Sequence, residues 1–123
     1  LVFQGGSTIE DGTNATLQML NEDCQATAVQ TVSDLVAIGC ANALLSQGLK
    51  IPGDMSLVGF GNILTAEHFR VPLTTVRQPK FRLGVAAVNM MMSLIRGEPV
   101  QPKRLTAELI ERESTAPPAA QGK

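Results

Sequence analysis

The chain has 123 residues, of which 44% are hydrophobic and only 3% aromatic, and its formal net charge is −1. This length suits one compact domain with an aliphatic core. The near-neutral charge, without a stripe of Lys and Arg, argues against direct binding to duplex DNA, because such binding depends on neutralising phosphates. No stretch approaches the ~20 apolar residues of a membrane-spanning helix, so no membrane partner is expected.

Hydrophobic patterning predicts strands that alternate with helices along the chain. The predicted strands cover residues 1–4, 26–32, 55–60, 73–76 and 105–110. The predicted helices cover residues 8–21, 34–47 and 79–96, with one helical turn at 65–69. This order predicts an α/β fold, with a doubly wound, mostly parallel sheet flanked by helices. Residues 115–123, rich in Pro, Ala and Gly, are expected to form a flexible tail.

Local signals mark the helix ends. Thr8 with Asp11 is a capping box, Ser33 is a good N-cap, and Gly48 is a typical C-cap. The helix at 34–47 is apolar almost all round, so it must be covered on more than one side. A sheet on one face and a second subunit on the other would provide that cover.

Catalytic and metal-binding patterns are weak. Cys24 and Cys40 lack metal-ligand spacing, although a disulfide between them stays open, and Cys40 is expected to be a buried thiol. His68 has no orienting partners, and Gly59-Phe60-Gly61 is not followed by the third glycine of a dinucleotide motif. No catalytic residue, metal or cofactor is expected, and the chain is not predicted to be an enzyme. With no initiator Met and no leader, we expect a fragment of a cytoplasmic protein.

The most informative stretch covers residues 57–79 and reads LVGFGNILTAEHFRVPLTTVRQP. Its first apolar run stops at Gly61-Asn62, and its second stops at Arg77-Gln78-Pro79. Two buried parallel strands that end in small or amide residues are typical of a ligand cleft at the carboxyl edge of a sheet. These residues therefore predict a binding site.

Together with the closing RESTAPP at 112–118, these motifs resemble the LacI/GalR family of transcriptional regulators over nearly the whole chain. The resemblance implies that residues 1–114 are the C-terminal part of a periplasmic-binding-protein-like effector domain. Residues 77–97 would be a crossover and helix that pack on an N-terminal subdomain outside the chain. A small-molecule effector, a saccharide or derivative, would then modulate DNA binding by an absent helix-turn-helix domain. The alternative is a periplasmic sugar-binding protein of a transport system.

The resemblance also implies a set of effector-binding residues: Ser7, Ser33, Asp34, Phe60, Gly61, Asn62 and Gln78. Three of them depart from the family's pattern, since Ser7 replaces an aromatic ring, Ser33 replaces an amide and Gly61 replaces a carboxylate. Losing a carboxylate that accepts charged hydrogen bonds argues against the usual hexose pose. Structural roles are also open, because Ser33 and Asp34 suit a helix N-terminus and Gly61-Asn62 suits a turn.

Self-association has two predicted sources. Ile38, Asn42, His68 and Phe69 match positions at the dimer contact of the family's repressors. An apolar stripe on the helix at 79–96 would be uncovered without its subdomain and is expected to drive a homodimer or larger assembly. It consists of Phe81, Val85, Val88 and Met92.

Overall fold

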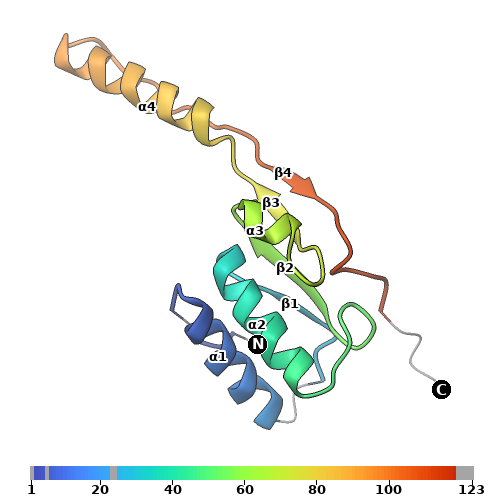
Figure 1. The fold of residues 1–123 in the computed structure, drawn as a ribbon. Helices are drawn as coiled ribbons and strands as arrows, with labels where there is room; N and C mark the ends of the chain where they lie inside the picture. The colour runs from blue at the N-terminus through green and yellow to red at the C-terminus, as the bar shows by residue number, and fades with distance from the viewer. Residues whose placement is uncertain (1, 5, 23–24, 119–123) are drawn as a thin grey trace.

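The computed structural model describes residues 2–4, 6–22 and 25–118. In these residues four strands form one sheet in the order β1-β2-β3-β4. The strands are β1 (Ala28–Gln30), β2 (Ser56–Phe60), β3 (Thr74–Arg77) and β4 (Glu108–Ile110). The helices are α1 (Ile9–Asn21), α2 (Asp34–Ser46), α3 (Leu64–Glu67) and α4 (Lys80–Ile95). Since β1, β2 and β3 are parallel and β4 alone is antiparallel, the α/β class with a mostly parallel sheet is confirmed (Figure 1).

The predicted helix caps are confirmed. The Asp11 backbone N–H donates to Thr8 Oγ1 at 3.1 Å, and the Thr8 backbone N–H donates back to Asp11 Oδ2 at 2.9 Å. Ser33 Oγ accepts from the Val36 backbone N–H at 3.3 Å and so caps α2. Gly48 follows α2 with a φ of 79°, the left-handed conformation that glycine adopts most easily.

Helix α2 is the centre of the core, and α1 and the sheet provide cover for it. The sheet lies on one side of α2, and α1 runs beside it on the other (Figure 1). The two helices approach closely at Gly12 and Gly39, where a Cβ on either residue would overlap the backbone of the other helix. Buried Leu44 and Cys40 of α2 pack with Leu57 of β2 in this core.

Residues 2–4 are not a strand, contrary to prediction, and residue 1 lies outside the described residues. A strand needs a hydrogen-bonded neighbour, and β1 pairs with β2 alone among the described residues. A cavity of about 630 Å³ is lined by residues 2–4, by β1 and by facing residues of α1 and α2. The apolar segment 2–4 therefore borders an open sheet edge.

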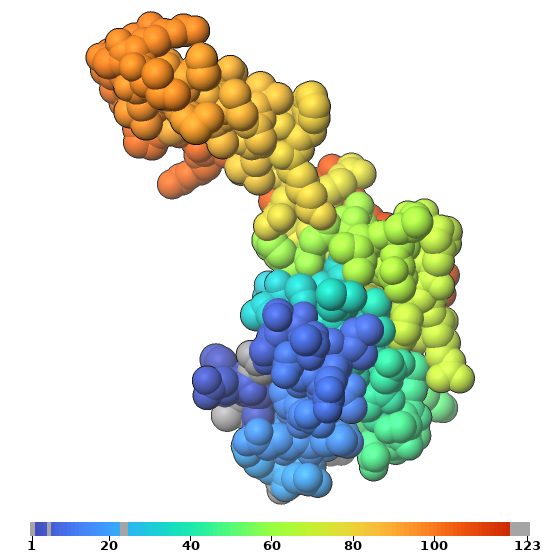
Figure 2. Space-filling view, turned by 60° about the vertical axis from the view of Figure 1, so that its left-hand side comes forward, coloured from blue at the N-terminus to red at the C-terminus, as the bar shows by residue number. Residues whose placement is uncertain are grey.

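Helix α4 projects away from the rest of the molecule as an arm (Figures 1 and 2). It follows Pro79, as predicted, and none of its residues is buried. The chain then returns to pair β4 with β3. No helix in the described part of the chain is long and apolar enough to cross a membrane.

The segment after β4 is bound to the sheet. The Thr74 backbone N–H donates to Ser114 Oγ at 2.8 Å, and the Ala116 backbone N–H donates to Ser56 Oγ at 3.1 Å. Thr115 and Thr74 share a hydrogen bond between their hydroxyls at 2.9 Å. The predicted flexible tail at 115–123 therefore includes two residues held by hydrogen bonds, and its last part, 119–123, lies outside the described residues.

Candidate ligand site at the carboxyl edge of the sheet

The carboxyl ends of the three parallel strands meet at one edge of the sheet. Ser33 follows β1, Asn62 follows β2 and Gln78 follows β3, and the register pairs Gln30 with Val58 and Phe60 with Val76. Because parallel strands point the same way, these three residues lie on the same edge.

The beginning of α1 reaches the same edge. Helices α1 and α2 run in the same direction, since Gly12 abuts Val36 and Thr16 contacts Cys40 four residues further along each helix. Their N-terminal ends therefore lie together above the carboxyl ends of the strands (Figure 1). Ser7, just before α1, is exposed at this end.

Asp34 is a structural residue at this edge and does not offer a free carboxylate to a ligand. Its side chain is buried, with 1% of the residue exposed. Oδ1 accepts a hydrogen bond from the Thr75 hydroxyl, and Oδ2 accepts one from the Ile63 backbone N–H at 2.8 Å. Gly59 makes room for this carboxylate, because a Cβ there would overlap Asp34 Oδ1. The expected ligand-binding role of Asp34 is therefore corrected to a role in joining α2, β3 and the loop after β2.

The loop after β2 has a fixed, left-handed shape. Gly61 has a φ of 129° and donates its N–H to the Val76 carbonyl at 2.9 Å. Asn62 has a φ of 50°, a conformation that Asn tolerates better than most residues, and its backbone N–H donates to Thr75 Oγ1 at 3.3 Å. Half-buried Phe60 ends the strand just before it.

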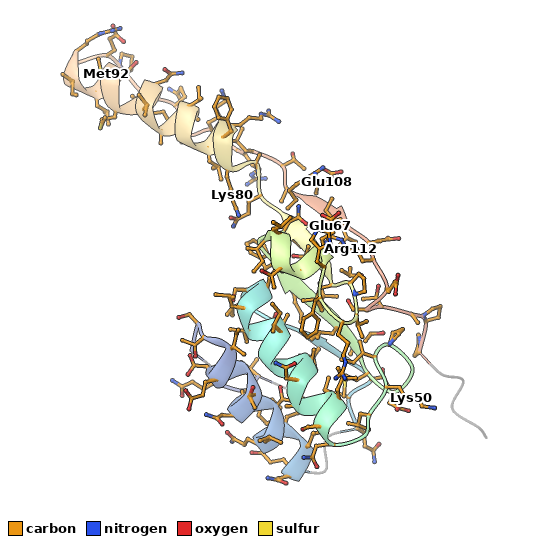
Figure 3. All side chains as sticks on the ribbon, in the orientation of Figure 1. Lys50, Glu67, Lys80, Met92, Glu108 and Arg112 are labelled. Carbon is orange, nitrogen blue, oxygen red and sulfur yellow. The ribbon has the colours of Figure 1, made fainter. Side chains whose placement is uncertain are left out.

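Arg112 is a functional candidate that the residue-by-residue sequence analysis missed. Its side chain is 13% exposed, and Nη2 donates to Asn62 Oδ1 at 2.9 Å. Nη1 donates to the Leu73 carbonyl at 2.9 Å, and Nη2 lies 3.5 Å from Glu67 Oε2 (Figure 3). Arg112 is the first residue of the RESTAPP motif. The sequence analysis used that motif only as evidence of the family resemblance and gave this arginine no role of its own.

Small neutral polar groups dominate the rest of the edge. Ser33 is half-buried and its Oγ caps α2, while Ser7 is exposed and contributes its backbone N–H to Asp11 Oδ2 at 2.9 Å. Gln78 is half-buried, and its side-chain amide has no hydrogen-bond partner among the residues the structure describes. The predicted residues thus converge, with hydroxyl and amide groups rather than a carboxylate at the surface.

The 630 Å³ cavity is centred beside β1, and its lining reaches this edge only at Gly6, Thr31 and Val32. It is lined by the outer side of β1 and by α1 and α2, and neither Ser33, Asn62 nor Gln78 belongs to its lining. Open strand edges present unpaired backbone groups that favour another strand. We therefore centre the ligand site on the carboxyl edge.

The four predicted dimer-contact residues do not form one exposed patch. Asn42 and His68 are exposed, and Phe69 is half-buried against the core. Ile38 is 5% exposed and belongs to the core, so its predicted place on a contact surface is wrong. Because α2 is apolar on nearly all sides, its sequence does not indicate which of its faces packs against α1.

Other chemical groups add little to this site. Within residues 2–4, 6–22 and 25–118 there is no cluster of three His, Cys, Asp or Glu that could hold a metal ion. Burial raises the pKa of the Cys40 thiol, which is 1% exposed, as expected for a buried cysteine. Cys24 lies outside the described residues, and so does the disulfide between Cys24 and Cys40 that the sequence left open.

Comparison with known proteins assigns this chain to a family. Residues 2–115 match the family model of the periplasmic binding protein-like domain. The chain belongs to that family. Within it, the chain is a LacI-type effector-binding region, as the relatives and solved structures below show.

The HTH-type transcriptional repressor PurR of Proteus mirabilis is 40% identical over 117 residues, which are 94% of this chain and 34% of the repressor. The lac repressor dimer bound to operator and the anti-inducer ONPF superposes with a TM-score of 0.83 at 31% identity, over 90% of this chain and 39% of that one. A LacI-family regulator from Enterococcus faecium with bound ribose gives 0.82 at 30% identity, over 95% and 44%. The chain thus spans about a third of the length of the curated relatives it matches.

Proposed function

We propose that this chain senses a small-molecule effector for a LacI-type transcriptional regulator, with the effector held at the carboxyl edge of the sheet. The observation that carries the proposal is the convergence of Ser33, Asn62 and Gln78 on one edge. That edge is where open α/β sheets bind ligands. The activity is binding rather than catalysis, since the edge offers hydroxyl and amide groups and no nucleophile with a base.

A saccharide or sugar derivative is the effector class that we propose. Hydroxyl and amide side chains such as Ser33 and Gln78 both donate and accept hydrogen bonds, as a sugar hydroxyl requires. The ribose bound to the Enterococcus faecium regulator supports this class. The missing ring at Ser7 and the missing carboxylate at Gly61 argue for a pose unlike the family's usual hexose.

Operator binding would come from a helix-turn-helix domain outside residues 1–123. The net charge of −1 makes this chain by itself a poor binder of duplex DNA. An effector that binds two conformations with different affinity would shift the orientation of that domain. Such a regulator acts on DNA, so we propose a cytoplasmic location and a homodimer as the working form.

The rival proposal is a periplasmic sugar-binding protein for transport. The PurR relative and the lac repressor described above are transcriptional repressors, which favours the regulator. Reading the coding sequence upstream of residue 1 distinguishes the two. A helix-turn-helix would support the regulator, and a secretory signal peptide would overturn it.

Ligand binding itself is tested by a thermal-shift panel of pentoses, hexoses and their phosphates, repeated with Gln78→Ala. The proposal predicts that at least one compound raises Tm and that the substitution removes the rise. A matched Gln101→Ala variant, on an exposed residue after α4, should keep it. A panel without any stabilising compound would contradict the proposal.

A further inference from the structure

Asn62 presents a fixed hydrogen-bonding group at the carboxyl edge because Arg112 holds the other end of its amide. The Arg112 guanidinium carries only donors, so it pairs with the carbonyl oxygen of an amide and never with its NH₂. The observed contact obeys this rule, with Nη2 at 2.9 Å from Asn62 Oδ1. Asn62 Nδ2 therefore faces away from the guanidinium.

Arg112 is itself held in place. Nη1 donates to the Leu73 carbonyl at 2.9 Å, and its backbone N–H donates to Thr74 Oγ1 at 3.0 Å. The contact with Glu67 adds a third partner. The backbone of Asn62 is fixed as well, through its N–H to Thr75 Oγ1. With both ends anchored, the amide has one favoured orientation.

The free end of this amide is open to a ligand. Asn62 Nδ2 has no hydrogen-bond partner among the described residues, and no buried side-chain nitrogen or oxygen there lacks one. Nδ2 is therefore accessible at the edge where Asn62 sits. The buried carboxylate of Asp34 accepts from the Thr75 hydroxyl and the Ile63 backbone N–H and makes no hydrogen bond to Asn62 Nδ2.

We propose that Arg112 is a positioning residue that makes Asn62 a donor, so that the site prefers a ligand with an acceptor-only group, such as a phosphate or carboxylate oxygen, at this point. The inference rests on the proposed function and deepens it by naming the chemistry of one ligand group. Phosphate is the better probe of this preference, because its charged oxygens form stronger hydrogen bonds than a sugar hydroxyl does.

The test compares ribose 5-phosphate with ribose by ¹H–¹⁵N NMR titration, following the amides of residues 33, 62 and 78 and the Nδ2 pair of Asn62. In the unaltered chain, ribose 5-phosphate should bind about tenfold more tightly than ribose and shift the Nδ2 signals. Asn62→Asp keeps an oxygen for Arg112 but puts an acceptor on the ligand side. It should abolish the preference for the phosphate while ribose still binds.

Three further substitutions separate a positioning role of Arg112 from an effect on stability. Arg112→Met frees the amide and should lower the phosphate preference, and Arg112→Lys, which again offers only donors to Oδ1, should restore it. Asn62→Gly keeps the left-handed turn, removes the amide and should also lose the preference. Binding of both probes at the edge with no change in preference in any variant would overturn the inference and leave the proposed function standing. Binding of neither probe would overturn the inference, and the panel of pentoses, hexoses and their phosphates then decides the proposed function.

Discussion

The Thr75 hydroxyl donates a hydrogen bond to Oδ1 of Asp34, and this contact joins the N-terminal end of α2 to β3 beneath the carboxyl edge. The other carboxylate oxygen accepts from the Ile63 backbone N–H, so the loop after β2 is fixed from the same side chain. The edge that presents Ser33, Asn62 and Gln78 is thus built on one buried carboxylate. Stability and ligand geometry are coupled at this point.

Asp34→Asn is expected to lower the free energy of unfolding by about 2–3 kcal/mol, since the amide has one oxygen for two buried donors. Either the Ile63 N–H faces the new NH₂ group, or the Thr75 hydroxyl accepts from that group and its own proton loses its partner. Urea denaturation measures this loss. Asp54→Asn is the matched control, because exposed Asp54 also accepts one backbone N–H, from Lys50 at 2.7 Å. The control should cost less than about 1 kcal/mol. Equal losses in the two variants would contradict the assigned role of Asp34.

Gly39→Ala is expected to destabilise the fold by about 1–3 kcal/mol, because its new methyl group overlaps the backbone of α1. Gly84→Ala in α4 meets no atom within 4 Å and should raise helix stability by roughly 0.5–1 kcal/mol. Urea unfolding followed by circular dichroism compares the two. If Gly39→Ala proved neutral, the close contact between α1 and α2 would be wrong.

The apolar stripe of α4 is expected to cause self-association. Phe81 is 84% exposed and Val88 is 53% exposed, and no residue of α4 is buried. Val88→Lys should reduce the mass measured by light scattering at a fixed concentration, whereas Gln101→Lys adds the same charge on another exposed residue and should not. A wild-type chain that is a monodisperse monomer would rule this prediction out.

Asp11 gives the first turn of α1 a defined pH dependence. Hydrogen bonds from Thr8, first from its side chain and then from its backbone, lower the pKa of Asp11 below its usual range. A carboxyl whose pKa is lower in the folded state stabilises fully above its unfolded value of about 4, and that contribution is lost as pH falls through the lowered pKa. Carboxyl ¹³C titration should show a depressed midpoint that Thr8→Ala moves upward. An unchanged midpoint in Thr8→Ala would remove the capping box as the cause.

Local features of the sequence predicted most of the fold. The capping box at Thr8, the N-cap at Ser33 and the glycine at Gly48 act within one helical turn, so their signals need no knowledge of the tertiary structure. The placement of Asn62 and Gln78 on one edge also followed from strand direction alone. These parts of the prediction were confirmed.

The features that failed depend on neighbours far along the chain. Residues 2–4 have a strand-like composition, but pairing decides whether a strand forms, and no described strand pairs with them. Ile38 was assigned to a dimer contact through the family resemblance, and only the packing of α2 against α1 and the sheet shows that its side chain is buried. The contact between Arg112 and Asn62 spans 50 residues, a separation at which sequence pattern carries no signal.

The central claim is that the carboxyl edge is where ligand binds, and an amide chemical-shift map of a ribose titration tests it most directly. The claim predicts the largest changes at Ser33, Asn62 and Gln78, with little change at Ala28 and Val29. Changes centred on the β1 side, around the cavity that those two residues line, would contradict it.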